Sequence, residues 1–424
     1  MKAKFGISVL LLVVNCCWSA PLTLRQVNLV YRHGDRSPIE IFPTDPNINY
    51  TWPQGIPGWL TNIGMNQHFE LGQWLQKRYN GFISSEYKAS EIQIQSSDEN
   101  RCLMSAYSNL AGMYPPKEGQ IWNTNITWQP IPVHTQPEEE DNILVMGKPC
   151  PKYDQLLDEA LKSHKISEEE KKNKDFYAYI GKKTGWDHNN ITNIWRIADS
   201  LFCEKTHNLT LPDWTNNRTV ENITVYEKLR LLESYQFTLL FGDNRSLYKG
   251  GPLLGLMLDN MRKMQNKTID TKFFMYSGHD TTVSALLSAL NIFNKKSPPY
   301  AATVILELHE DPPKNYYVNI LYKNSTDSFT TDSYTNMVLP NCTMNCSFEM
   351  VVEQTKHRVP GNWDEECALP SGDPTTETWK FSPAWMVATV VSCLLCVVVG
   401  IFIVFAVKKR ERRAFLYGKF DTTQ

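Results

Sequence analysis

The chain has 424 residues, with 43 lysines and arginines against 45 aspartates and glutamates, and a formal net charge of −2. This length permits one large domain or two modest ones with ample core. The near-zero charge and the lack of a basic stripe in the body of the sequence exclude the usual electrostatic footprint of a nucleic-acid-binding protein.

The first segment, residues 1–19, is predicted to be a secretory signal peptide. Two lysines near the start precede an apolar stretch, Ile7–Trp18, that ends at small residues, which is typical of a cleaved signal. Residues 20–368 are then expected to form a lumenal or extracellular body. Eleven Asn-x-Ser/Thr sequons and six cysteines in this body are consistent with an oxidising compartment.

The first predicted strand is an alternating apolar run at residues 27–31, followed directly by Arg-His-Gly-Asp-Arg-Ser-Pro at residues 32–38. Arg32 and Arg36 offer planar forks of donors that match phosphate oxygens. His33 between them can attack phosphorus as the neutral imidazole, since neighbouring cations disfavour the imidazolium. Open α/β sheets bind ligands at the C-terminal ends of strands. We therefore interpret the motif as a phosphate site, in preference to a strand-end loop with a surface histidine.

Two later segments repeat the order strand, polar turn, helix. Residues 91–95 alternate and lead through a polar turn to Arg101 and a helical pattern. Residues 273–276 are a continuous apolar run suited to a buried strand, followed by His279 and Asp280 and a second helical pattern. Helix N-termini carry free N–H groups and partial positive charge, so both turns are candidate anion sites. Either turn alone would be explained equally well as an ordinary capped turn.

A mainly helical stretch, roughly residues 150–250, separates these motifs, and strands are predicted at 303–308 and 317–322. The charge run at residues 168–172 is interpreted as a solvated helix face. This order of elements predicts an α/β layered domain with a smaller helical cap.

The C-terminal part predicts a membrane anchor. Residues 369–383 have the composition of an exposed stalk, and residues 384–407 form an uncharged apolar run long enough to cross a bilayer as a helix. Basic residues follow at once, which places the tail, 408–424, in the cytosol. Tyr417 stands three residues before Phe420, as in endocytic and lysosomal sorting signals. We expect a single-pass type I membrane protein of the lysosome, endosome or cell surface.

The chain resembles the histidine acid phosphatases, in particular their prostatic and lysosomal subgroup, from about Leu24 to Cys367. Four markers carry the resemblance, in order: RHGDRSP at 32–38, the turn with Arg101 and its following Leu-Met-Ser-Ala, IPVHT at 131–135 and HDTT at 279–282. The resemblance implies a phosphoglycerate-mutase-like fold, with a mixed central sheet flanked by helices and the helical insert as a cap.

The resemblance also implies a role for each site residue. His33 would become phosphorylated, and Asp280 would protonate the leaving oxygen and then take a proton from the attacking water. The groups that would hold the phosphate oxygens are Arg32, Arg36, Arg101 and His279. Three guanidiniums and an imidazolium at residue 279 would supply the positioning and charge stabilisation that phosphoryl transfer needs. A carboxyl group that acts as a general acid must carry its proton before the reaction, so acidic pH should favour the reaction. No metal or other cofactor is expected.

Further expectations from the resemblance concern pairing and contacts. Disulfides are implied between Cys150 and Cys367 and between Cys342 and Cys346. The partner that Cys203 has in relatives is missing, and Cys102 is an additional cysteine, so these two are expected to be free thiols or to form a new bridge. Trp195 resembles an aromatic residue on the wall of the family's active-site cleft. Trp128 and His134 resemble positions at a homodimer contact.

The expected substrates are small phosphate monoesters, and the sequence does not choose among nucleotides, lysophospholipids and phosphoproteins. A metal-dependent phosphatase is a weaker interpretation, because the nine histidines are dispersed and no second His/Asp cluster completes a two-metal set. A cysteine-based phosphatase would need an arginine six residues after a cysteine, which is absent. A catalytically silent membrane glycoprotein that binds phosphorylated ligands would not require both a nucleophile and an acid.

Overall fold

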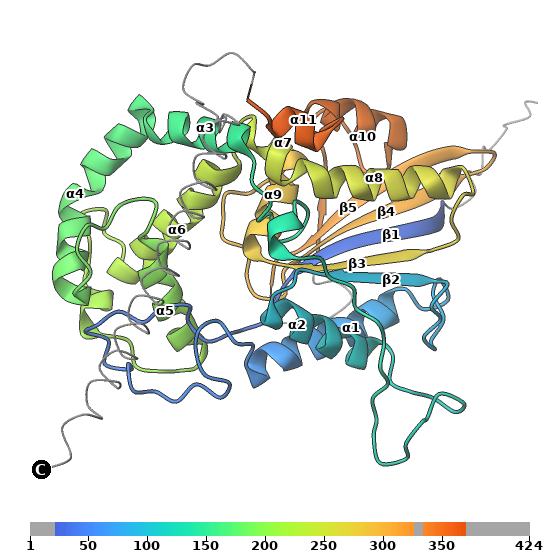
Figure 1. Cartoon of the computed structure of the whole chain (residues 1–424), viewed down its shortest axis with the longest axis horizontal. Helices are drawn as coiled ribbons and strands as arrows, with labels where there is room; N and C mark the ends of the chain where they lie inside the picture. Colours follow the sequence, from blue (N-terminus) through green and yellow to red (C-terminus); the bar gives the residue numbers. More distant parts are fainter. Residues whose placement is uncertain (1–21, 326–333, 370–424) are drawn as a thin grey trace, which may run out of the picture. The chain divides into compact units, whose positions relative to one another are not determined.

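The computed structural model describes residues 22–325 and 334–369 (Figure 1). The predicted signal peptide, membrane span and cytosolic tail lie outside the described residues, as does the stalk beyond Leu369. The described residues up to Ala368 belong to one structural unit. Within the part of the chain that is described, no helix has both the length and the apolar character to cross a membrane.

A mixed β-sheet forms the centre of this unit (Figure 1). Its strand order is β2-β3-β1-β4-β5-β6, with β7 paired to β5. Strands β2, β3 and β1 run parallel, and β4, β5, β6 and β7 are joined in antiparallel pairs. The bounds are β1 Thr23–Arg32, β2 Ile92–Ser96, β3 Phe273–Gly278, β4 Thr303–Asp311, β5 Asn315–Lys323, β6 Thr335–Met337 and β7 Cys346–Ser347.

Helices cover both faces of the sheet, which explains why β1 is buried on both sides. Leu29 and Tyr31 of β1 belong to a core with α1 (Asn62–Arg78) and α2 (Asn100–Met113). Val30 belongs to a second core with α8 (Gly251–Gln265) and α9 (Asp280–Ala289). Successive strand side chains point to opposite faces, so Leu29 and Tyr31 pack into one layer and Val30 into the other, with helices on both sides of the sheet (Figure 1). The predicted mixed sheet flanked by helices is confirmed.

The helix pair α1 and α2 packs unusually closely through two glycines. A Cβ atom at Gly72 would lie 2.0 Å from the carbonyl oxygen of Asn109, and one at Gly112 would lie 2.0 Å from that of Phe69. Any larger side chain would separate the helices. This contact holds the second half of α2 against α1, and Arg101 lies in the first turn of the same helix.

A helical region lies between α2 and α8, where the sequence predicts the cap. Its helices are α3 Pro151–Leu161, α4 His164–Thr184, α5 Trp195–Thr206, α6 Val225–Phe241 and α7 Arg245–Lys249. Residues of α4, α5 and α6 share an apolar core of their own, which includes Ile180, Leu201 and Leu229. The chain ends this unit with α10 (Phe348–Thr355) and α11 (Trp363–Cys367).

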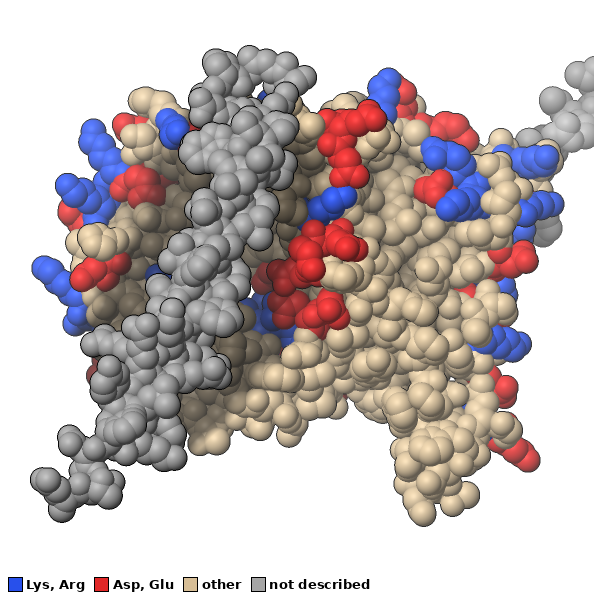
Figure 2. Space-filling view, viewed as in Figure 1, with Lys and Arg blue, Asp and Glu red and all other residues tan. Residues whose placement is uncertain are grey.

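The charged side chains of the visible face are unevenly distributed (Figure 2). Several Asp and Glu side chains gather near the middle of the view, Lys and Arg lie mostly toward its edges, and no continuous basic stripe is visible. In the run at 168–172, Glu168, Lys171 and Lys172 are exposed on α4. This agrees with a solvated helix face.

The cysteines pair as the resemblance implies. Bridges join Cys150 to Cys367 and Cys342 to Cys346. Cys102 and Cys203 are buried free thiols, so no new bridge forms between them.

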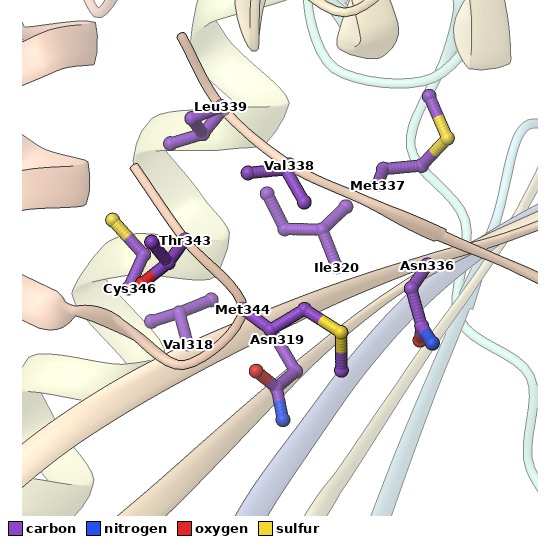
Figure 3. Close-up of a pocket in the computed structure, with 10 residues that line it drawn as sticks. All are labelled: Val318, Asn319, Ile320, Asn336, Met337, Val338, Leu339, Thr343, Met344 and Cys346. Carbon is purple, nitrogen blue, oxygen red and sulfur yellow. The ribbon is translucent and has the colours of Figure 1, made fainter. Parts of the chain in front are cut away.

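A small hollow beside β5 and β6 is not a ligand site (Figure 3). It has a volume of about 10 Å³ and is lined mainly by apolar side chains such as Val318, Ile320 and Leu339. A space of this size holds at most about one water molecule.

Candidate functional site

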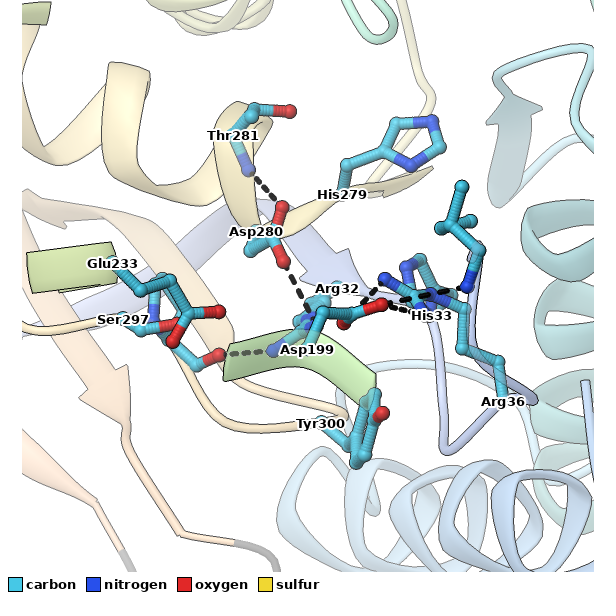
Figure 4. A network of polar contacts seen from close by, with 12 residues as sticks. Arg32, His33, Arg36, Asp199, Glu233, His279, Asp280, Thr281, Ser297 and Tyr300 are labelled. Carbon is cyan, nitrogen blue, oxygen red and sulfur yellow. Dashed lines mark hydrogen bonds and ion pairs between the residues drawn. The ribbon is translucent and has the colours of Figure 1, made fainter. Parts of the chain in front are cut away.

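A cleft of about 620 Å³ opens where the loops after β1 and β3 meet α5 and α6. Five of the six predicted site residues line it, and the sixth, Arg32, is bonded to one of them. The structure therefore brings together residues from three distant parts of the chain (Figure 4). The lining residues include His33, Arg36, Glu99, Arg101, Trp195, Asp199, Glu233, Gln236, Phe237, His279 and Asp280.

The loop that carries His33 is held tightly against the start of α1. A Cβ atom at Gly34 would lie 2.3 Å from the carbonyl oxygen of Gly64, so only glycine permits this approach. The backbone N–H of Asp35 donates to Oε1 of Gln67 at 2.8 Å. At the other side, the N–H of His33 donates to the carbonyl of Gly278 at the end of β3, at 2.9 Å.

The imidazole of His33 is fixed in one tautomer. Its Nδ1 lies 2.8 Å from the carbonyl oxygen of Gly34. A carbonyl oxygen only accepts, so Nδ1 carries the proton and Nε2 keeps its lone pair. The residue is 2% exposed. Burial and the guanidiniums of Arg101, Arg32 and Arg36 hold the pKa of His33 well below its ordinary value, so the ring is neutral and nucleophilic.

Each of the three predicted phosphate-binding guanidiniums has its own carboxylate partner. The pairs are Arg32–Asp280 at 2.8 Å, Arg36–Asp199 with two bonds of 2.9 Å, and Arg101–Glu99 at 2.9 Å. The carboxylates hold the guanidiniums in place around the cleft before any ligand binds.

The Nε atoms of the same three arginines are buried without a hydrogen-bond partner among the described residues. A buried N–H group left unpaired costs about 1–3 kcal/mol. A ligand with several acceptor oxygens, placed beside His33, would satisfy these donors together. Three unpartnered cationic donors around one imidazole are the feature expected of a binding site for a tetrahedral oxyanion such as phosphate.

Asp280 is the first residue of α9 and is partly buried. Its Oδ1 accepts from the backbone N–H of Thr281 at 2.8 Å. Burial alone would raise the pKa of Asp280, but the guanidiniums of Arg32 and Arg36 outweigh burial and lower it. The carboxyl group is therefore ionised while the cleft is empty.

His279 corrects one expectation. Arg101 Nη2 donates toward its Nδ1 at 3.4 Å, and its Nε2 lies 3.0 Å from Oγ of Ser97. Burial, followed by the charge of Arg101, lowers the pKa of His279 to about 3. The ring is thus a neutral imidazole in the empty cleft. The sequence analysis expects an imidazolium at residue 279 during phosphoryl transfer; in the empty cleft, burial and then the charge of Arg101 favour the neutral ring.

Carboxylates in the cleft were missed by sequence reasoning. Asp199 lies on α5 and Glu233 on α6, both far along the chain from the motifs. Burial raises the pKa of Glu233 to about 7 although Arg230 pairs with it. A signal for Asp199 exists in the sequence: acidic Asp199 and Glu204 share the buried part of α5 with apolar Ile197 and Leu201. Trp195, at the start of α5, lines the cleft as expected.

The alternative nucleophiles do not fit the geometry. Sγ of Cys203 lies 3.7 Å from Nη1 of Arg36, and Sγ of Cys102 lies 3.6 Å from Nε2 of His279. Burial raises the pKa of Cys102 to about 12 and raises that of Cys203 as well, so both stay as unreactive thiols.

Within residues 22–325 and 334–369, no three His, Cys, Asp or Glu side chains are grouped as metal ligands.

Comparison with known proteins relates the chain to one family. Residues 23–323 match the histidine phosphatase superfamily (branch 2). Human lysosomal acid phosphatase is 39% identical over 376 residues, which cover 87% of this chain and 86% of the relative. Human prostatic acid phosphatase is 39% identical over 356 residues, which cover 84% of this chain and 90% of the relative.

Solved structures agree on the fold. The Hafnia alvei phytase in complex with tartrate aligns with a TM-score of 0.62 and 16% identity, over 83% of this chain and 100% of the phytase. The phytase from Klebsiella sp. ASR1 aligns with a TM-score of 0.60 and 14% identity, over 82% and 100%. From the sequence match and the shared fold together, the chain belongs to the histidine phosphatase superfamily (branch 2).

Proposed function

We propose that His33 is the nucleophile with which this protein, an acid phosphatase of the histidine phosphatase superfamily, hydrolyses phosphate monoesters. The reaction passes through a phosphohistidine intermediate. One observation carries the assignment of the residue. The unprotonated Nε2 of His33 shares a cleft with three buried guanidiniums whose Nε–H groups have no partner among the described residues.

In the first step, the phosphate oxygens of the substrate accept from Arg32, Arg36 and Arg101. Their charge offsets that of the dianion, so the lone pair of His33 Nε2 can reach phosphorus. A bond forms between Nε2 and phosphorus while the ester P–O bond breaks. The carbonyl of Gly34, which accepts from Nδ1–H, stabilises the positive charge that develops on the ring.

Asp280 is the proposed general acid, and substrate binding gives it its proton. The incoming phosphate competes for the Arg32 guanidinium that keeps Asp280 ionised. Losing this cation and gaining a dianion as neighbour both raise the pKa of the carboxyl group. Asp280 then protonates the leaving oxygen, and its carboxylate afterwards takes a proton from the water that attacks the phosphohistidine. Inorganic phosphate leaves and His33 is restored.

His279 is proposed to follow the same logic. The phosphate dianion favours its protonation, and an N–H group of the ring then donates to a phosphate oxygen.

The test is to trap the phosphorylated residue. Protein is mixed with p-nitrophenyl phosphate carrying labelled phosphate at about pH 5, where a carboxyl acid holds its proton, and is quenched without acid. We expect label on His33, and none in His33→Ala, which should also lose turnover by ~10⁴-fold or more. The control His164→Ala removes an exposed histidine of α4 and should behave like the unaltered protein. Label on another residue, or normal turnover by His33→Ala, would contradict the assignment.

For location, we propose a lumenal body held by the predicted single membrane span, in the lysosome. Two observations support this: relatives are lysosomal acid phosphatases, and all eleven sequon asparagines are at least partly exposed. Removal of N-glycans should increase gel mobility, and the protein should resist extraction from membranes with alkaline carbonate. A protein without glycans, or one released by carbonate, would contradict the proposal.

A homodimer is proposed at the segment around Trp128 and His134. Trp128 is exposed beside further exposed apolar side chains, Ile121, Trp122 and Ile126, which a second copy would cover. Sedimentation should give twice the chain mass, and Trp128→Glu should give the monomer. Phosphoproteins and lysophospholipids remain proposed substrates within the monoester class.

A further inference from the structure

We infer that Asp199, on cap helix α5, is a positioning residue for the reaction: it orients the Arg36 guanidinium so that its Nε–H edge faces the phosphate. The inference rests on the proposed function, which makes Arg36 a phosphate-binding group. A residue of the cap would then support the phosphate-binding loop that follows β1 and carries His33 and Arg36.

The contact between Asp199 and Arg36 is a buried fork. Oδ2 and Oδ1 of Asp199 accept from Nη1 and Nη2 of Arg36, both at 2.9 Å, and the two side chains are 6% and 7% exposed (Figure 4). A guanidinium has two such donor edges. Asp199 occupies the edge formed by the two Nη atoms. The edge that includes Nε has no partner among the described residues and is left for a ligand.

The same helix holds the rest of the loop. His207, which caps the end of α5, lies 2.7 Å through Nε2 from Oδ2 of Asp35. Arg196 donates to the carboxylate of Glu40 at 3.1 Å, and the hydroxyl of Ser200 donates to the backbone carbonyl of Glu40. Arg196 lies three positions before Asp199 and four before Ser200, and His207 lies eight positions after Asp199. At these spacings the side chains share one side of the helix. Helix α5 thus contacts the loop after His33 along its length.

The pairing with Asp199 orders the Arg36 side chain before phosphate binds. An arginine side chain is long and flexible, and ordering it on binding costs free energy. Because Asp199 orders Arg36 in the empty cleft, this cost is met before the phosphate arrives. All phosphate monoesters share the phosphate group, so loss of Asp199 should affect them equally, whatever their leaving group.

The variant Asp199→Asn keeps the size of the side chain but places an NH₂ group against one Nη donor, which turns the guanidinium. We expect kcat/KM to fall by ~10- to 100-fold for both p-nitrophenyl phosphate and glycerol phosphate. The inhibition constant of inorganic phosphate should rise by a similar factor. The matched control is Glu40→Gln, which weakens another contact between α5 and the loop but touches no phosphate-binding group. Its kcat/KM should stay within about twofold of the unaltered protein.

A structure of the unaltered protein with inorganic phosphate supplies a measurement that does not depend on a variant's folding. Both bonds between Asp199 and Arg36 should remain below about 3.2 Å while Nε of Arg36 contacts the phosphate. The inference is wrong if Arg36 leaves Asp199 for the ligand, if the Asp199→Asn variant binds phosphate more tightly, or if that variant matches the Glu40 control. In those cases an inactive His33→Ala variant still supports the proposed function. Full activity of His33→Ala would instead remove the function itself.

Discussion

At the scale of single residues, the proposed role of Asp280 as general acid requires a carboxylate in the empty cleft and a protonated carboxyl group when the leaving group departs. The bond of 2.8 Å to Arg32 provides the first condition. Competition for Arg32 by the substrate provides the second, since a carboxyl group next to a dianion and without its cation binds a proton more strongly. In this proposal Asp280 is protonated only when phosphate is bound, and the protonated fraction increases as the pH falls.

We predict that Asp280→Asn discriminates between leaving groups. An alkoxide needs a proton to depart, whereas p-nitrophenolate departs without one. The kcat for glycerol phosphate should fall by ~10²- to 10⁴-fold, the usual contribution of general acid catalysis, and the kcat for p-nitrophenyl phosphate by much less. Steady-state kinetics at about pH 5 measure both. Equal losses on the two substrates would mean that Asp280 acts only by holding Arg32.

The sequence predicted the cationic groups of this site and Asp280, but not the carboxylates Asp199 and Glu233. Arg32, His33 and Arg36 sit in one short motif, so their proximity follows from the chain itself. Asp199 and Glu233 reach the cleft only through the packing of α5 and α6 against the loop. Helical periodicity can place Asp199 on the apolar side of α5, but it does not show which group the carboxylate pairs with. For the same reason the neutral state of His279, which depends on burial, was not foreseen.

At the scale of elements, helix α5 also carries a buried carboxyl group, Glu204, that is hydrogen-bonded to another carboxyl group. Glu204 is 1% exposed and lies against Asp45, a carboxyl group that is 3% exposed. Burial, and then the hydrogen bond with Asp45, raise the pKa of Glu204 to about 9. In the unfolded chain the pKa of a glutamate is about 4.3. The folded form therefore binds a proton that the unfolded form releases between about pH 4 and 9.

The contribution of this pair to stability is therefore largest in acid. The stabilisation from Glu204 is complete below its unfolded pKa and is lost as the pH rises toward 9. Urea unfolding at pH 5, 7 and 8.5 should show the fall in the free energy of unfolding. Glu204→Gln should flatten it, whereas Glu159→Gln, at an exposed position of α3, should leave it unchanged. A fall of equal size in both variants would rule out Glu204 as its source.

The elements themselves were largely predictable, for a physical reason. Alternation at 27–31 and the continuous apolar run at 273–276 are direct consequences of burial on one or both faces of a strand, and both segments are strands in the structure. The polar turns after residues 91–95 and 273–276 lead into α2 and α9, whose first turns bring Arg101 and Asp280 to the cleft. The arrangement of α3 to α7 was not predictable. Helical periodicity shows which side of a helix is apolar, but not which other helix covers it.

At the scale of the whole described unit, the bridge between Cys150 and Cys367 joins residues 217 positions apart. It ties the start of α3 to the end of α11. Around it, Tyr153, Tyr248 and Trp363 form a small apolar cluster. Everything from the cap to the last strands of the sheet lies within the loop that this bridge closes, including Asp199 and Asp280.

The two disulfides should therefore contribute unequally to stability. A cross-link stabilises by restricting the unfolded chain, and the effect grows with the length of the closed loop. Replacing both cysteines of the 150–367 bridge by serine should lower the free energy of unfolding by about 5 kcal/mol, against about 2 kcal/mol for the bridge between Cys342 and Cys346. Denaturant unfolding of the two double variants measures the difference. The folded variants should keep kcat/KM, because none of these cysteines lines the cleft. Equal losses would contradict the dependence on loop length.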